Sequence, residues 1–289
     1  MTSIIFGAAG QDGYYLSTLL KSLNHHVIEV SRTTGYNSTD ITSYESVSLL
    51  IKTHQPNLLF HFAANSTTRH DALFENHATI GTGTLNILEA VKKFSPETKV
   101  FISGSGLQFV NNNVPIKESD AFEARDAYAV SRIQSVYASR YFRDQLGVQT
   151  YVGYLFNHDS PRRSERHMTK KISEAAKRIS NGSDEKLIIG DITAVKEWSY
   201  AKDIVEGIWT LVNQTNVFEA NISSGKGHSI EDWLTICFEH FNLNWKEHVV
   251  INPDFVPDYK MLVSNPSLIN SLGWQTTTNI EALAQLMLA

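Results

Sequence analysis

Residues 3–13 read SIIFGAAGQDG, a short apolar run followed by glycines at positions 7, 10 and 13. The apolar run predicts a buried strand, and residues 13–24 have the apolar spacing of a helix. Glycines between a strand and a helix let the backbone approach a pyrophosphate, while the helix N-terminus offers free N–H groups and a partial positive charge. This placement predicts a dinucleotide-binding turn. The residues expected to contact the dinucleotide are Gly7, Gly10, Gln11, Asp12 and Gly13.

Downstream, apolar runs alternate with amphipathic stretches of helical length as far as about residue 156. Strands are expected at 26–30, 58–63, 99–103 and 148–155, and helices at 44–54, 78–93 and 126–145. Such alternation requires right-handed crossovers and gives a parallel sheet covered on both faces. The predicted fold class is α/β, a doubly wound sheet of the Rossmann type with a smaller α/β substrate-binding lobe.

After residue 156 the rhythm breaks, and later elements are shorter, at 187–189, 203–212, 218–222 and 229–241. We expect residues 1–156 to form the dinucleotide-binding lobe. Residues 157–289 are expected to form mainly the second lobe, interleaved with the last strands of the sheet.

Bulk composition narrows the function classes. Lys and Arg total 25 against 30 Asp and Glu, so nothing predicts binding to nucleic acid. The single cysteine, Cys237, excludes an internal disulfide and has the apolar neighbours of a buried helix position. No apolar run approaches the roughly 18 residues of a membrane span, and no leader pattern is seen, so a cytoplasmic protein away from membranes is expected. The eleven histidines show no metal-ligand spacing, and no metal is expected.

The end of the second strand discriminates between the two nicotinamide dinucleotides. A carboxylate there suits the ribose hydroxyl of NAD, and a cation suits the 2′-phosphate of NADP. Ser31 and Arg32 fit a phosphate, whereas Glu29 comes too early in the strand. The sequence therefore favours NADP(H) and leaves NAD(H) open. Asp40 either reaches the adenine amino group or is a solvated loop residue.

The end of the third strand faces the cofactor in this fold. Ala63 and Ala64 are expected to contact it through their backbone, while the imidazole of His61 is expected to be structural. Ser66, just beyond, is a candidate substrate contact.

Tyr128 and Arg132 lie four residues apart on a predicted helix and so project from one face. Ser105 follows the fourth strand. Together these groups can exchange a proton with a sugar oxygen: the tyrosine carries the proton, the cation favours the phenolate, and the serine binds the same oxygen. A nicotinamide then moves hydride at the attached carbon. We expect Ser105, Tyr128 and Arg132 to be the catalytic residues.

Four segments resemble the GDP-mannose 4,6-dehydratase group of the extended short-chain dehydrogenases/reductases, the NAD-dependent epimerase/dehydratase family. They are GQDG at 10–13, YLFNHDSPRR at 154–163, GDITAVKEWSYAKD at 190–203 and GW at 273–274. The resemblance implies a tightly held NADP, a sugar-nucleotide lobe and a homodimer. It also implies substrate contacts for Asn157 at the diphosphate, Lys171 in a flanking helix and Lys196 where the family carries arginine. Arg162, Arg163 and Arg166 form either a phosphate clamp, with Arg163 as the expected substrate contact, or a solvated loop.

Three departures from the family bear on the chemistry. Arg132 replaces the family's lysine and keeps the charge on a wider, planar donor. Leu107 replaces the glutamate that serves as acid/base in removing water across C5 and C6. Residues 256–259, VPDY, replace an Arg-Pro-x-Glu that grips the nucleotide, which weakens the case for GDP.

Hydride transfer remains feasible with these three departures, whereas dehydration lacks the acid/base that it requires. The sequence therefore favours a 4-keto-sugar reductase or epimerase acting on a nucleotide sugar, with a GDP-linked hexose or heptose expected. One alternative is a 4,6-dehydratase whose base is displaced to Glu118 or Asp126. Another is an inactive homologue that binds NADP(H) as a sensor or partner subunit.

The predicted helix that carries Tyr128 also has an apolar stripe. The stripe either forms the face of a homodimer or belongs to the core. It consists of Ile133, Val136, Tyr137 and Tyr141.

Overall fold

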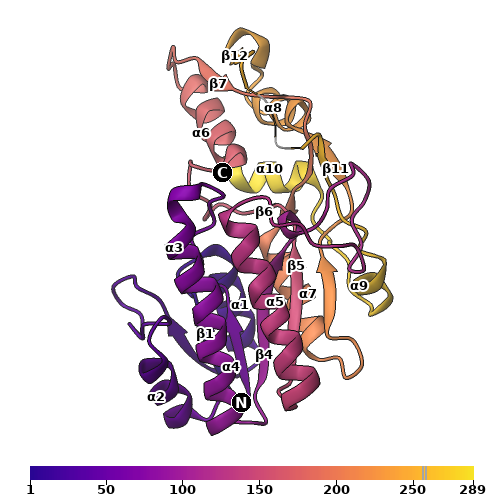
Figure 1. Ribbon diagram of the computed structural model, residues 1–289. Helices are drawn as coiled ribbons and strands as arrows, with labels where there is room; N and C mark the ends of the chain where they lie inside the picture. The colour runs from indigo at the N-terminus through magenta and orange to yellow at the C-terminus, as the bar shows by residue number, and fades with distance from the viewer. Residues whose placement is uncertain (256, 258) are drawn as a thin grey trace.

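The computed structural model describes residues 1–255, 257 and 259–289. A six-stranded sheet with order β10-β5-β4-β3-β1-β2 lies at the centre, and every neighbouring pair is parallel. Crossover helices therefore cover both of its faces (Figure 1), and the predicted fold class is confirmed. The strands are β1 (Thr2–Phe6), β2 (His26–Val30), β3 (Leu58–His61), β4 (Lys99–Ser105), β5 (Thr150–Leu155) and β10 (Glu219–Ile222).

Side-chain alternation along the strands divides the core between the two faces. Ile4 and Phe6 point to one face and pack with apolar residues of α2, α4 and α5. Ile5 points to the other face, where it packs with α1 and α7. These helices are α1 (Gln11–Ser22), α2 (Tyr44–His54), α4 (Gly83–Phe94), α5 (Ala127–Leu146) and α7 (Ala201–Val212).

The helix expected over 78–93 differs from the prediction. A 3₁₀ turn (η1, His70–Ala72), a short α3 (Leu73–Asn76) and a π-helical turn (η2, His77–Thr82) precede α4. Glycine favours this irregularity because it permits close approach to α5: a Cβ at Gly81 would lie 2.6 Å from Oε1 of Gln134. The third strand is also shorter than expected, since it ends at His61.

The second lobe has its own core around Trp198 and Trp233, whose ring centroids are 5.7 Å apart. It gathers at the carboxyl ends of the sheet strands (Figure 1). Cys237 is fully buried in this core, as predicted, and burial raises the pKa of its thiol. The elements are α6 (Met168–Ser180), β7 (Leu187–Ile189), β8 (Val195–Glu197), β11 (Gly227–Ser229), α8 (Ile230–Glu239), η4 (Trp245–Glu247), β12 (Val249–Ile251), β13 (Met261–Leu262) and α10 (Ile280–Leu288).

The chain crosses between the lobes several times. After α6 and β7 it returns to the first lobe for α7 and β10, and again for α9 (Ser267–Ser271), where Ile269 and Trp274 join the core with Phe101. A two-stranded parallel pair, β6 (His158–Asp159) with β9 (Ser199–Tyr200), also precedes α7. The lobe boundary at residue 156 stays a prediction.

None of the helices in the described residues is long and apolar enough to cross a bilayer.

Candidate active site

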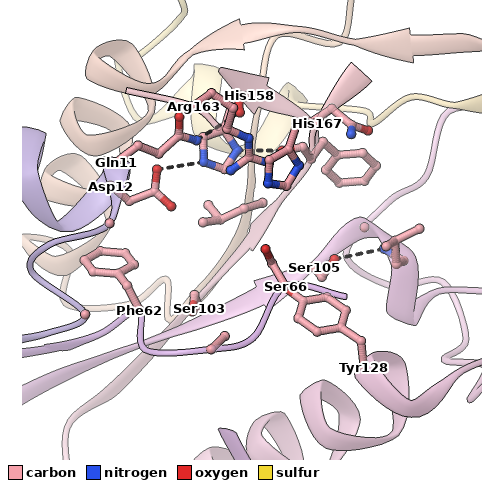
Figure 2. Close-up of a pocket in the computed structure, with 18 of the residues that line it drawn as sticks. Gln11, Asp12, Phe62, Ser66, Ser103, Ser105, Tyr128, His158, Arg163 and His167 are labelled. Carbon is pink, nitrogen blue, oxygen red and sulfur yellow. Dashed lines mark hydrogen bonds and ion pairs between the residues drawn. The ribbon is translucent and has the colours of Figure 1, made fainter. Parts of the chain in front are cut away.

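A cavity of about 400 Å³ lies at the carboxyl ends of β1, β3, β4 and β5, the edge where open α/β sheets bind ligands. One wall comes from the glycine turn, the end of β4 and the first turns of α5. The facing wall comes from residues 155–167, and Figure 2 shows side chains from both walls directed into the space between them.

The glycine turn fits a pyrophosphate. Gly7 has φ of +88°, and a Cβ there would lie 2.7 Å from the backbone nitrogen of Ala63. A Cβ at Gly13 would lie 2.4 Å from the carbonyl oxygen of Gly7. Gly10 is the N-cap of α1 and gives the helix no side-chain cap, so the first-turn N–H groups remain available to an anion. Gln11 and Asp12 also line the cavity.

The other predicted cofactor contacts are dispersed. Ala64 lines the cavity, whereas Ala63 meets the glycine turn instead. Arg32 lies outside the lining at the exposed end of β2, with its Nη2 3.4 Å from Oε1 of Glu75. Asp40, also outside, uses Oδ1 to accept hydrogen bonds from the backbone N and the Oγ1 of Thr42.

The structure brings Ser105, Tyr128 and Arg132 together in the cavity wall. The guanidinium carbon of Arg132 is 5.0 Å from the ring centroid of Tyr128, and the arginine is only 4% exposed. Its Nη1 donates to the backbone oxygen of Ser103 and, over 2.8 Å, to that residue's Oγ. The Ser103 hydroxyl in turn donates to the carbonyl oxygen of His61 over 2.9 Å, which fixes the direction of this chain of hydrogen bonds.

Ser105 ends β4 and caps the 3₁₀ turn η3 (Gly106–Gln108). Its Oγ accepts a hydrogen bond from the backbone nitrogen of Leu107 over 3.2 Å, and its own N–H is bound by Gln108. No described residue accepts the hydroxyl proton of Ser105, so this proton is available for a ligand oxygen (Figure 2).

Leu107 separates the main cavity from an adjoining one of about 280 Å³ that also reaches Asp126 and Tyr259. Asp126 caps α5 by accepting from the backbone nitrogen of Ala129 over 2.8 Å. Glu118 lines neither cavity and accepts from the backbone nitrogen of Asn221. Residues 256 and 258, part of the altered family motif, lie outside the described residues.

The facing wall is tied to the glycine turn by side-chain hydrogen bonds. Gln11 donates to the carbonyl oxygen of His158 over 3.0 Å and accepts from Ser160 over 3.0 Å. The Nε2 of His158 lies 2.8 Å from Oδ1 of Asp12 (Figure 2). These contacts fix the beginning of α1 against β6.

Three of the predicted substrate contacts, Ser66, Asn157 and Arg163, line the cavity. The Oδ1 of Asn157 is buried and has no hydrogen-bond partner among the described residues, as expected for a group that awaits a ligand donor. Arg163 forms an ion pair with Asp159, with 3.1 Å between Nε and Oδ1.

The two predicted lysine contacts lie outside the cavity lining. Lys171 donates to the carbonyl oxygen of Ile188 over 3.0 Å, and the Nζ of Lys196 is 5.2 Å from the ring centroid of Tyr259. The ligand-binding roles of all the residues above stay predictions.

Sequence reasoning missed Ser103, His158 and His167, which all line the cavity. Arg162, which the sequence offered as a candidate for the phosphate clamp, lines it as well. Ser103 had a signal, because it lies two residues before Ser105 and so on the same strand face. His158 lies inside one of the segments that carried the family resemblance. In the described part of the chain, no three His, Cys, Asp or Glu side chains are grouped as metal ligands.

Comparison with known proteins agrees with this arrangement. GDP-mannose 4,6 dehydratase 2 of Arabidopsis thaliana is 27% identical over 317 residues, which cover 99% of this chain and 85% of that protein. The fold matches the UDP-glucose 4-epimerase of Thermus thermophilus in complex with NAD, with TM-score 0.86, 18% identity and coverage of 100% and 98% of the two chains. It also matches RMD from Pseudomonas aeruginosa complexed with NADPH, with TM-score 0.85, 18% identity and coverage of 99% and 97%.

The family model for GDP-mannose 4,6 dehydratase matches residues 4–287, almost the whole length. This match agrees with the Rossmann-type parallel sheet described above. The chain therefore belongs to the GDP-mannose 4,6-dehydratase family, within the extended short-chain dehydrogenases/reductases that modify nucleotide sugars.

Proposed function

We propose that the chain reduces a nucleotide-linked 4-keto sugar, or epimerises a nucleotide sugar through a transient ketone, with NADP(H) as the favoured dinucleotide. One observation carries the proposal. Ser105, Tyr128 and Arg132 line a single cavity with the glycine turn, while the neighbouring position is occupied by Leu107.

In this proposal each side chain has a separate task. Tyr128 gives a proton to the sugar oxygen, or takes one from it, and the free hydroxyl proton of Ser105 binds the same oxygen. Arg132, which is itself buried, stabilises negative charge on the phenol oxygen. The nicotinamide supplies or accepts the hydride when it is bound.

Dehydration requires a further acid/base, and the position where the family carries its glutamate is occupied by Leu107. Leu107 has no proton to exchange. Among the described residues, Asp12 is the only carboxylate in the main lining, and it is engaged by His158. A 4,6-dehydratase remains the second candidate, because the family relatives are dehydratases and Asp126 lies in the adjoining cavity next to Leu107.

The preference for NADP(H) over NAD(H) rests on the end of β2. The carboxylate of Glu29 is already engaged by Ser17 at 2.6 Å and Lys21 at 2.9 Å, so it does not face a ribose. Arg32 follows the last residues of β2, and a cation at this strand end suits a 2′-phosphate. GDP is proposed as the nucleotide on the strength of the family relatives.

A homodimer through the outer face of α5 is also proposed. Tyr137 and Tyr141 are 57% and 55% exposed, one helical turn apart on this helix. Val136, by contrast, is fully buried in the core and cannot contribute to such a face.

The test incubates purified protein with NADPH and GDP-4-keto-6-deoxymannose and follows NADPH oxidation. Turnover supports the proposal. Tyr128→Phe should lower kcat by about a hundredfold or more, because the proton donor is lost, while NADPH affinity stays within about twofold. Full activity of Tyr128→Phe contradicts the assigned site.

A parallel incubation supplies GDP-mannose without added cofactor. A 4-keto product there favours the dehydratase. Tight NADPH binding without turnover in either reaction favours the third candidate, an inactive homologue that acts as a sensor or partner subunit.

A further inference from the structure

The imidazole of His158 faces an acceptor with each of its ring nitrogens. Nδ1 lies 2.7 Å from the carbonyl oxygen of Phe156, and Nε2 lies 2.8 Å from Oδ1 of Asp12. The histidine is 8% exposed, so water cannot easily substitute for either partner.

Counting hydrogens fixes the charge of this ring. A carbonyl oxygen only accepts, so Nδ1 must carry a hydrogen, and an ionised carboxylate likewise only accepts, so Nε2 must carry one as well. Only the imidazolium form of histidine carries a hydrogen on both ring nitrogens and can donate from each. The geometry therefore gives His158 a positive charge opposite the negative charge of Asp12.

We propose that His158 is a positioning residue that stores a proton beside Asp12, and that binding of the anionic dinucleotide depends on this proton. The inference rests on the proposed dinucleotide site. Asp12 is in the first turn of α1, the helix whose N-terminus is available to a phosphate. A bare carboxylate there would repel the same anion.

Charged and titratable groups of neighbouring elements also lie around the pair. Arg163 and Asp159 lie on the same wall as His158, His167 precedes α6, and Arg132 approaches from α5. Arg163 and Arg132 favour the ionised form of Asp12, while Arg163 disfavours the imidazolium.

For both Asp12 and His158, their mutual interaction opposes the effect of burial on the pKa. Burial by itself would raise the pKa of Asp12, but the charge and hydrogen bond of His158 leave that pKa below its usual value. Burial would lower the pKa of His158, yet Asp12 raises that pKa on balance. Both directions agree with an ion pair between Asp12 and His158.

When the pH rises through this pKa, His158 releases its proton to solvent. Asp12 then loses its counter-charge, and one of the two acceptors faces a nitrogen lone pair. Dinucleotide affinity is therefore constant at neutral pH and falls as the medium becomes alkaline.

The test measures NADPH binding by fluorescence from about pH 7 to about pH 9.5, where wild type should weaken by about tenfold. His158→Gln should bind weakly at pH 7 and lose the pH dependence. The double variant Asp12→Asn/His158→Gln removes both charges, so its affinity should recover and be independent of pH. A wild-type affinity that stays constant over the range overturns the proposal.

His167→Gln is the matched control in the same cavity. Burial, reinforced by Arg163 and Arg166, lowers the pKa of His167 to about 4, so this residue is already neutral and the variant should keep the wild-type pH dependence. If His167→Gln loses the pH dependence of NADPH binding, the responsible residue is His167 and the proposal for His158 is wrong.

Nitrogen NMR of the wild-type protein needs no variant. At about pH 7.5 the proposal expects hydrogens on both ring nitrogens of His158, and a neutral ring would refute it. Neither readout requires turnover, so a failed keto-sugar assay with a protonated His158 and pH-dependent NADPH binding would reject the proposed reaction alone.

Discussion

The two ends of α5 hold their arginines in opposite ways. Near its N-terminus, Arg132 is buried against neutral acceptors of Ser103, and no described carboxylate lies within ion-pair distance. Near its C-terminus, Arg140 and Arg143 both reach Glu219, at 2.7 Å and 3.2 Å. One end of the helix leaves a cation without a counter-ion, and the other neutralises its cations.

This difference separates function from stability. A buried charge without a counter-ion is costly to fold, so it persists where a ligand or a developing charge makes use of it. A paired cluster at the base of the sheet holds elements together instead: Glu219 joins β10 to α5, and Tyr154 of β5 donates to the same carboxylate over 2.6 Å. Substitutions at the two ends should therefore affect different measurements.

The largest effect is expected at the unpaired end. Arg132→Met should lower kcat by about a hundredfold or more, because the cation that favours the phenolate is lost. The free energy of unfolding should change by no more than about 1 kcal/mol, since a buried charge without a counter-ion is also removed. Turnover kinetics and thermal unfolding on the same preparation test both statements.

Arg132→Lys is the control for charge. It keeps the cation but cannot reproduce the planar fork that reaches both oxygens of Ser103, so intermediate activity is expected. If Arg132→Met loses much stability and little turnover, Arg132 has a structural role and the contrast between the two ends of α5 is wrong.

The paired end should show the opposite result. Glu219→Gln leaves Arg140 without its counter-ion and leaves Arg143 with Asp144 alone, so it should lower the free energy of unfolding by roughly 2 kcal/mol. Activity per folded molecule should stay unchanged, because Glu219 does not line the cavity. Chemical denaturation with a parallel turnover assay tests this, and a selective loss of kcat would place Glu219 in the site.

In the wild type, acid should remove the contribution of the Glu219 carboxylate to the free energy of unfolding. Burial alone would raise the pKa of Glu219, but hydrogen bonds from Arg140 and Tyr154 leave it below 4.5. A lowered folded pKa gives stability that is fully present above about 4.5 and is lost as the pH falls through the folded value. The stability difference between wild type and Glu219→Gln should therefore narrow in acid. A difference that stays constant down to about pH 2 would mean that the carboxylate charge is not the cause.

The sequence predicted that Tyr128, Arg132 and the glycine turn lie together, because their placement depends on local periodicity. A spacing of four on a helix brought Tyr128 beside Arg132, and a strand followed by glycines located the turn that begins at Gly7. These relations hold within one or two elements, so the rest of the fold need not be known.

The facing wall could not be predicted in the same way. Asp12 and His158 meet across 146 residues of sequence, and their contact depends on how the chain enters β6 after the sheet is built. Lys171 and Lys196, which were assigned by resemblance alone, lie outside the cavity lining because their side chains are engaged by Ile188 and by the ring of Tyr259. Long-range packing, which has no local signal, decides these positions.

The smallest expected effect concerns the acceptor that holds the unpaired cation. Ser103→Ala removes the Oγ that accepts from Arg132 but leaves the backbone oxygen, so the guanidinium loses one of two hydrogen bonds. A lost hydrogen bond to a charged group is worth about 1 to 2 kcal/mol, and kcat should fall by roughly tenfold with little change in KM. Ser103→Thr keeps the hydroxyl and should recover most of the rate. If both variants lose activity equally, added or missing volume at β4 explains the loss, and Ser103 does not position Arg132 through its hydroxyl.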